Sequence, residues 1–183
     1  MDYPFVESPN ATPTKGRPIH VVVIHTMETS ERSDAAEAVA RWFARAETAV
    51  SAHYCVDADS VVQCVREEDV AWHARGGNAS SIGIELAGYA GQGPKGWDDD
   101  YSWAVLERAA ALAADICARY AIPVRWVRAE GLRSGVRGLT GHVEVSRAFR
   151  KSDHWDPGPA FPVARFLRLV RQAQRVASAR PSP

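Results

Sequence analysis

Two kinds of hydrophobic pattern alternate along this chain. Short apolar, β-branched runs are typical of buried strands, and a strictly alternating stretch with a polar break in its middle predicts a hairpin. These strands are predicted at residues 20–25, 51–65 (the hairpin), 81–86 and 122–127. Longer stretches repeat apolar residues every three or four positions, the spacing of an amphipathic helix. They predict helices over residues 34–46, 101–120 and 161–177.

Strands that alternate with helices predict an α/β fold, with a central mixed β-sheet flanked by helices. The 183 residues fit one domain better than two. We assign residues 19–177 to this domain. Residues 1–18, rich in Pro, Asn, Thr and Ser, form an irregular N-terminal arm, and residues 178–183 form a tail or the start of a linker. The glycine-rich stretch 130–141 and residues 152–161 are predicted to be loops.

Composition and charge exclude several classes of function. Hydrophobic residues make up 46% of the chain and the net charge is zero, which excludes a disordered protein. A dedicated nucleic-acid-binding protein needs a basic surplus, which is absent. No segment approaches the roughly 20 apolar residues of a membrane span. Nothing in the pattern indicates an obligate oligomer, so we expect a monomer.

Basic residues are nevertheless concentrated near the C-terminus, with five arginines and no acid after Asp156. Solvated helix faces explain this best, and a dipolar surface that orients the domain on an anionic polymer is the alternative. Residues 1–4 lack the basic and apolar regions of a secretory signal. We therefore expect synthesis in a cytoplasm, followed by release if the protein acts elsewhere.

The three cysteines, Cys55, Cys64 and Cys117, form no CxxC motif, which excludes a cysteine zinc cluster. If Asp59 and Ser60 form a two-residue turn, Cys55 lies opposite Cys64 in the hairpin. A cross-strand disulfide is then possible, but a reduced pair is favoured for a protein made in a cytoplasm.

Three histidines stand where α/β folds place functional groups: His25 ends a buried strand, His142 follows a glycine-rich loop, and His154 lies in the second loop. Any one of them is more often a hydrogen-bonded core residue. Two histidines and a carboxylate with a fourth position open, however, are the ligand set of a catalytic zinc. Asp156 is a suitable third ligand because Pro157-Gly158 fixes a turn behind it.

Glu85 is a charged residue inside the apolar run 81–86. A buried glutamate is unfavourable unless it faces a polar site or an opposite charge. Two interpretations follow: a strand-edge residue paired with an arginine, or a general base beside a metal site.

These residues lie in segments that resemble zinc-dependent N-acetylmuramoyl-L-alanine amidases, which share a fold with the peptidoglycan recognition proteins. The matching segments occur in the family's order and run from about residue 19 to 170. They are 21–26, 50–54, 71–74, 78 with 81–86, 141–142 and 156–161. The form Ser-Asp-His-Trp-Asp-Pro-Gly-Pro at 152–159 is most similar to endolysins of phages infecting actinobacteria.

The resemblance implies one zinc ion on His25, His142 and Asp156, with Glu85 as the catalytic base. It implies hydrolysis of the amide between N-acetylmuramic acid and L-alanine, with peptidoglycan as the partner. Residues expected to line or shape the substrate groove are His53, Trp72, His73 and Asn78, although core packing is an equal alternative for Trp72. The remaining histidine, His20, is expected to be structural.

His154 departs from the family pattern, because many members carry a lysine at this position. A lysine is a fixed cation, whereas a histidine titrates near neutrality. We expect a protonated His154 to stabilise the developing oxyanion together with zinc.

Three other interpretations remain open at this point. A peptidoglycan-binding module without activity is disfavoured because all three ligands are present. A cysteine–histidine peptidase using Cys55 with His53 or His73 is disfavoured because Cys55 lies inside a strand, not at a helix N-terminus. A cytoplasmic recycling amidase would equally lack a signal peptide, but the 152–159 segment and the tail favour an endolysin.

Overall fold

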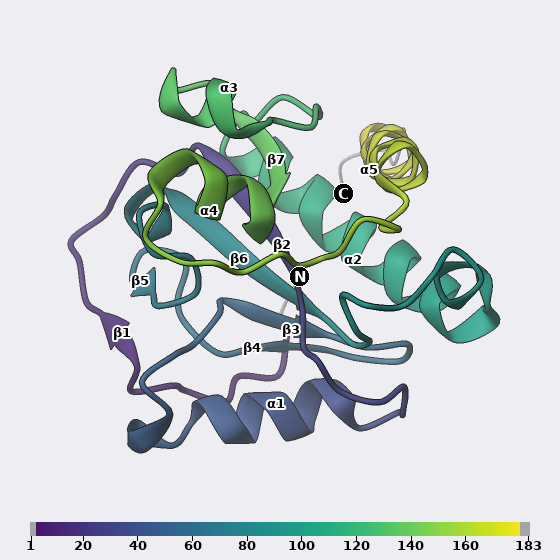
Figure 1. Cartoon of the computed structure of the whole chain (residues 1–183), viewed down its shortest axis with the longest axis horizontal. Helices are drawn as coiled ribbons and strands as arrows, with labels where there is room; N and C mark the ends of the chain where they lie inside the picture. Colours follow the sequence, from purple (N-terminus) through teal and green to yellow (C-terminus); the bar gives the residue numbers. More distant parts are fainter. Residues whose placement is uncertain (1–2, 180–183) are drawn as a thin grey trace.

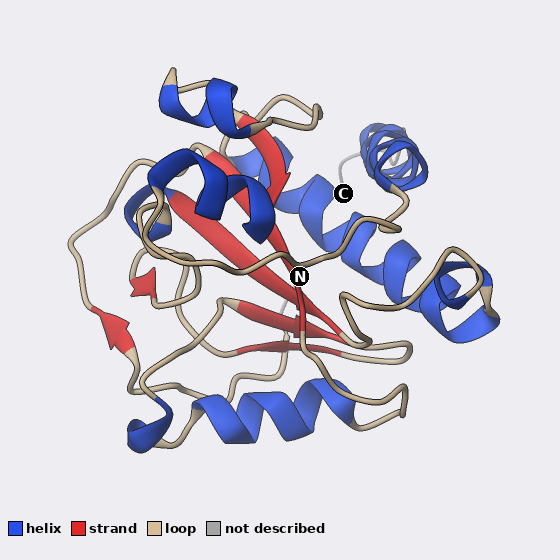
Figure 2. Cartoon of the chain, in the orientation of Figure 1, coloured by secondary structure: helices blue, strands red, loops and turns tan. Residues whose placement is uncertain are grey.

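A computed structural model describes residues 3–179, in which a five-stranded mixed sheet lies between helices (Figures 1 and 2). The strands are β1 (Ala11–Thr12), β2 (Val21–Thr26), β3 (Tyr54–Val56), β4 (Val61–Gln63), β5 (Val70–Ala71), β6 (Ser81–Leu86) and β7 (Gly138–Gly141). The α-helices are α1 (Ala35–Phe43), α2 (Asp100–Arg119), α3 (Ala129–Arg133), α4 (His142–Phe149) and α5 (Val163–Ser178). Short 3₁₀ helices are η1 (Ala46–Thr48), η2 (Asn78–Ser80) and η3 (Gly96–Asp98). The predicted fold class is confirmed.

The sheet order is β4-β3-β6-β2-β7, with β1 and β5 forming a separate antiparallel pair. Strand β2 runs parallel to both β6 and β7, and β3 runs parallel to β6. Only β4 is antiparallel to its neighbour. The central strands β2 and β6 read as apolar runs because helices cover both faces of a parallel sheet. Their register places His25 beside Glu85.

Alternate residues of a strand point to opposite faces, and the two faces have different roles. On one face, Val22, Ile24 and Ile82 pack with residues of α2 and α5 in the largest apolar core. The other face carries two smaller cores. Val21 and Val23 belong to the one near α4, whereas Cys55 belongs to the one near α1. His25 and Glu85 point to this second face.

The structure differs from the prediction in the segment between α2 and α4. Residues 122–127 form no strand and make only a bridge between Trp126 and Leu139, while β7 forms in the stretch predicted to be a loop. Gly138 explains the close pairing, because a Cβ there would lie 2.6 Å from the Arg125 carbonyl oxygen. Helices α3 and α4 were not predicted, since they have only five and eight residues.

The hairpin register predicted from a two-residue turn is wrong by two residues. Val56 pairs with Val61, so Cys55 lies opposite Val62 and not opposite Cys64. The Asp57 carboxylate accepts hydrogen bonds from the backbone amides of Asp59 and Ser60 and thereby closes a four-residue turn. Cys64 is consequently a diagonal neighbour of Cys55; both thiols are free, with 3.8 Å between their sulfurs.

The N-terminal arm lies against the domain. Its Asn10 side chain donates hydrogen bonds to the backbone carbonyls of Phe43 and Arg45, at the C-terminal end of α1. Residues 180–183 of the predicted tail lie outside the described residues.

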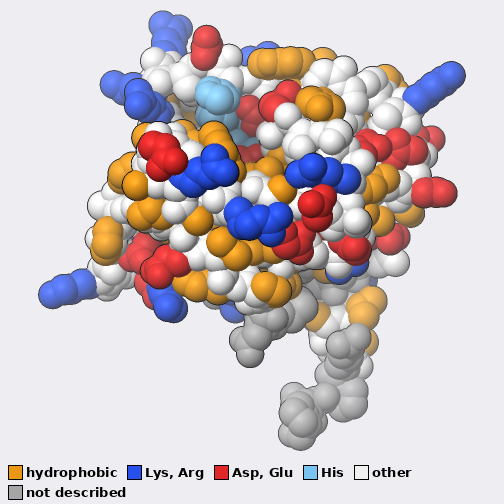
Figure 3. All heavy atoms as spheres, turned by 90° about the horizontal axis from the view of Figure 1, so that it is seen from below, with side chains coloured by type: hydrophobic (Ala, Val, Ile, Leu, Met, Phe, Trp, Pro, Cys, Tyr) orange, Lys and Arg blue, Asp and Glu red, His pale blue; other side chains and the backbone are white. Residues whose placement is uncertain are grey.

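Acidic and basic side chains are interspersed with apolar ones on the face seen in Figure 3. Arg165, one of the C-terminal arginines, pairs with Asp98 at 2.7 Å. In the described part of the chain, no helix is both long enough and apolar enough to cross a membrane.

Candidate active site

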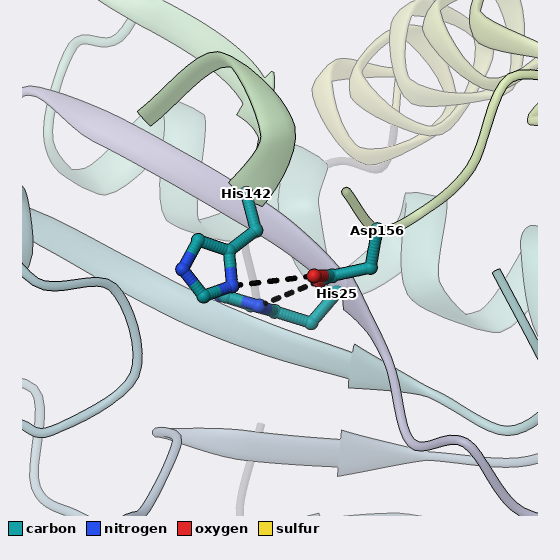
Figure 4. A group of neighbouring side chains, drawn as sticks. All are labelled: His25, His142 and Asp156. Carbon is teal, nitrogen blue, oxygen red and sulfur yellow. Dashed lines mark hydrogen bonds and ion pairs between the residues drawn. The ribbon is translucent and has the colours of Figure 1, made fainter. Parts of the chain in front are cut away.

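The predicted metal ligands meet where three parallel strands end. His25 lies near the C-terminal end of β2, and His142 is the first residue of α4, directly after β7. Asp156 approaches from the loop between α4 and α5 (Figure 4). The carboxyl ends of parallel strands are the usual ligand-binding edge of an α/β sheet. The fold therefore brings together all three predicted ligands.

The ligand atoms converge on one point. His25 Nδ1 lies 2.9 Å from Asp156 Oδ2, and His142 Nδ1 lies 3.3 Å from Asp156 Oδ1. One potential ligand atom from each residue lies within 4.8 Å of the others, and all three residues are buried. Zinc bonds of about 2.0–2.1 Å in a tetrahedron separate ligand atoms by roughly 3.3 Å. The spacing fits a zinc ion.

The protonation states also fit a metal site. Burial alone would raise the pKa of Asp156, but the neighbouring imidazoles of His142 and His25 outweigh it and hold this pKa well below its ordinary value. Burial lowers the pKa of His142, and the His25 ring adds to the lowering. An ionised carboxylate and a neutral imidazole are the forms that bind metals.

Two glycines allow the backbone segments near His142 and Asp156 to pack closely against their neighbours. The Val143 amide donates a hydrogen bond of 2.9 Å to the Asp156 carbonyl, and a Cβ on Gly141 would lie 2.6 Å from Pro157 Cδ. Gly158 has a φ of +88°, and a Cβ there would lie 1.8 Å from the Ala90 carbonyl oxygen. Only glycine permits both this conformation and this approach.

Glu85 faces the same site from the adjacent strand, in register with His25. Burial raises its pKa well above the ordinary value, and the charges of Asp156 and Glu28 raise it further. No side chain in the described part of the chain forms a hydrogen bond to its carboxylate. A Glu85 carboxylate therefore takes up a proton more readily than an exposed glutamate does, and the alternative of an arginine-paired edge residue is wrong.

A cavity of about 640 Å³ opens over the cluster, with Glu85 and all three ligands in its wall. This volume lies within the range of small-molecule sites. The wall is apolar on the α1 side, where Trp42, Val50 and Trp72 are 44%, 38% and 38% exposed. The cavity thus combines a polar centre with an amphipathic rim.

Three of the four predicted groove residues line this cavity: Trp72, His73 and Asn78. Trp72 is not a core residue, because its exposed indole donates a hydrogen bond of 3.0 Å to Thr12 Oγ1. The side-chain Oδ1 of Asn78 accepts a hydrogen bond from the Ala74 amide and so shapes the wall.

The prediction for His53 is wrong. Its side chain is fully buried, and its Nδ1 accepts a hydrogen bond of 3.0 Å from the Gly83 amide. His53 directly precedes β3, and its ring packs against that of His73 with 5.6 Å between the centroids. It supports the sheet and does not reach the cavity.

His154 lies at the edge of the ligand cluster. Its ring stacks on that of His142 with 4.3 Å between the centroids, and its Nδ1 lies 3.6 Å from Asp156 Oδ1. Burial lowers its pKa, and the neighbouring His142 lowers it further. Both effects disfavour the imidazolium form of His154 on which the expected role depends. A neutral ring still donates one N–H group.

Several cavity residues were missed from the sequence, among them Glu28, Trp42 and Trp155. Glu28, at a φ of +53°, accepts hydrogen bonds from Thr26 Oγ1 and the Ala90 amide and joins two walls of the cavity. Trp155, which is 53% exposed, lies inside the segment that suggested His154 and Asp156, and this position could have indicated it. Trp42 lies on α1 and its indole is exposed toward the cavity.

Comparison with known proteins identifies the family. Its sequence profile, described as N-acetylmuramoyl-L-alanine amidase, matches residues 15–159. The chain belongs to this family. It is 31% identical to N-acetylmuramoyl-L-alanine amidase A of Achromobacter lyticus, a match that covers 81% of each chain. The enzyme class of the chain is therefore that of an N-acetylmuramoyl-L-alanine amidase.

Solved structures support the fold of this amidase. The hydrolase AmiA of Staphylococcus aureus, solved in complex with its ligand, matches with a TM-score of 0.72 and 16% identity over 100% of this chain and 88% of its own. A selenomethionine derivative of AmpD matches with a TM-score of 0.61 and 25% identity. This match covers 92% of this chain and 94% of the AmpD chain.

Proposed function

We propose that this amidase binds one zinc ion on His25, His142 and Asp156 and cleaves the bond between N-acetylmuramic acid and L-alanine in bacterial peptidoglycan. The observation that carries the proposal is the convergence of the three ligand atoms within 4.8 Å beside Glu85. Family membership supports the bond and the polymer, and the ligand spacing supports the metal.

Zinc, when bound, supplies a Lewis acid that polarises a carbonyl oxygen and lowers the pKa of water. Glu85 takes the proton from the attacking water, because its carboxylate has an increased basicity and faces the site. The same group then returns a proton to the amine of the departing L-alanine. Neutral His154 donates an N–H group toward the oxygen that gains charge.

The cavity suits an amphipathic polymer segment. The exposed tryptophans Trp42 and Trp72 offer apolar surface, and the polar centre takes the amide. The protein needs no partner subunit to complete its site, because all three ligands and Glu85 come from one chain. We therefore propose that it acts as a monomer.

The identity of the reaction is tested by mass spectrometry of digested peptidoglycan. We expect free peptides with an N-terminal L-alanine and intact glycan strands. A chelator should stop the release and added zinc should restore it, whereas a thiol-alkylating reagent should have no effect. Cut glycan strands, or activity that persists without metal, would contradict the proposal.

We propose further that the enzyme is the catalytic domain of a phage endolysin, made in the host cytoplasm and active on the cell wall after release. The 152–159 segment and its resemblance to actinobacterial phage enzymes support this role. Production in an actinobacterium together with a membrane-permeabilising holin should lyse the cells, whereas the enzyme alone should not. Lysis without a holin, or survival with one, would contradict this role.

A further inference from the structure

Both ring nitrogens of the ligand His25 have partners. Its Nδ1 faces Asp156, and its Nε2 lies 3.0 Å from Nδ1 of His73. In a neutral imidazole one nitrogen donates a hydrogen bond and the other accepts. A metal ligand has to present the bare nitrogen to the ion, so His25 needs its proton on Nε2. The orientation of His25 therefore depends on which nitrogen of His73 is protonated.

The imidazole ring of His73 packs directly against the backbone of a glycine. Its imidazole lies against Gly83 in the middle of β6, where a Cβ would come within 2.6 Å of His73 Cγ and 2.7 Å of Nδ1. A glycine inside a strand weakens it and often marks such a close approach. The two imidazole planes of His73 and His25 meet at 87°, with 5.2 Å between the ring centroids. This geometry aims the His73 nitrogen at the edge of His25.

Ser81 decides the tautomer of His73. Its hydroxyl donates its only hydrogen to the Gly77 carbonyl at 2.8 Å, and its oxygen lies 3.1 Å from His73 Nε2. Because that hydrogen is already used, the Ser81 oxygen accepts from His73 and the proton of His73 is on Nε2. The Nδ1 atom of a neutral His73 is then an acceptor, and it takes the N–H of His25.

We propose that His73 and Ser81 are positioning residues for the metal ligand His25. The Gly77 carbonyl orients the Ser81 hydroxyl, Ser81 fixes the proton on the far nitrogen of His73, and His73 turns the bare Nδ1 of His25 toward the proposed metal position beside Asp156. This gives His73 a role other than the substrate contact predicted from the sequence. The inference rests on the proposed zinc site.

Zinc affinity, measured by competition with a chelating dye, tests the inference without reference to activity. His73→Leu should weaken zinc binding about 10- to 100-fold, the range for partners of metal-bound histidines. His73→Asn should recover most of the loss, because its amide oxygen can accept the His25 N–H. Ser81→Ala should weaken binding by less than His73→Leu, since the ring of His73 remains. The matched control, His20→Leu with His20→Asn, should bind as the wild type does.

The outcomes separate the two proposals. Absence of zinc binding by the wild type would overturn the metal site itself. Two results would overturn only the positioning role, provided that the wild type binds zinc. One is an unchanged zinc affinity of Ser81→Ala. The other is an equal loss of zinc affinity in His73→Leu and His73→Asn. Thermal unfolding of the metal-free variants identifies any that fail to fold. Ser81→Ala removes a single oxygen and decides the question if His73→Leu does not fold.

Discussion

Replacing Asp156 with alanine is expected to abolish both zinc binding and hydrolysis. Asp156 contributes the only negative charge among the three ligands, and it is the residue that contacts both His25 and His142. Two neutral imidazoles alone leave the ion with too few ligands for a stable catalytic site. We expect no retained zinc by elemental analysis after dialysis, and peptide release slower by on the order of 1000-fold or more.

Asp153→Ala is the matched control for this prediction. Asp153 lies on the same loop, carries the same charge and is exposed. It should retain one zinc ion and nearly the wild-type rate. One equivalent of zinc in folded Asp156→Ala would show that the ligand set is different.

Glu85→Gln is expected to separate catalysis from metal binding. The amide keeps the shape of the side chain but cannot take a proton, so kcat should fall by roughly 100- to 10,000-fold. Zinc content should stay at one ion, because Glu85 is not among the ligands. Single-turnover kinetics together with elemental analysis would measure both. Glu68→Gln, an exposed residue away from the cavity, should change neither.

The same variant has a second, pH-dependent effect. Burial raises the folded-state pKa of Glu85, so the unfolded chain releases this proton at a lower pH than the folded one. As pH rises above the unfolded-state value near 4.5, the free energy of unfolding of the metal-free wild type therefore falls. Glu85→Gln has no ionisable group at this position, so its free energy of unfolding does not decrease in this way. Urea unfolding should find the variant more stable at pH 7 than the wild type, with little difference at pH 4.

A variant that is less stable than the wild type at pH 7 would contradict the raised pKa. An unchanged kcat, or a loss of zinc, would contradict the role as a base. The two parts of the prediction are measured on different forms of the protein, with and without metal, so each can fail alone.

The sequence predicted the centre of the site better than its surroundings. The apolar runs containing His25 and Glu85 are recognisable as strands because both faces are covered, and parallel pairing of these strands brings the two residues together. The direction of His53 was not predictable, because it precedes β3 in irregular backbone where strand alternation does not apply. The hairpin register depended on a side chain, Asp57, that closes the turn through hydrogen bonds.

The short helices and strands could also not be predicted from the sequence. Helix α4 has eight residues and begins at the ligand His142, so few apolar repeats mark it. Strand β7 contains two glycines, Gly138 and Gly141, which are typical of loops. In the structure both glycines are needed because other segments pass close to them. The secondary structure at these positions is determined by tertiary packing, which a local sequence pattern does not predict.

The distance along the chain between the ligands has a consequence for the cell that makes the enzyme. His25 and Asp156 are 131 positions apart in sequence yet in direct contact in the fold. A nascent chain lacks its third ligand until nearly the whole domain has left the ribosome. A chain that ends before the loop between α4 and α5 therefore lacks one ligand of the proposed zinc site. Zinc binding at the proposed site would require synthesis to have passed Asp156 in this loop.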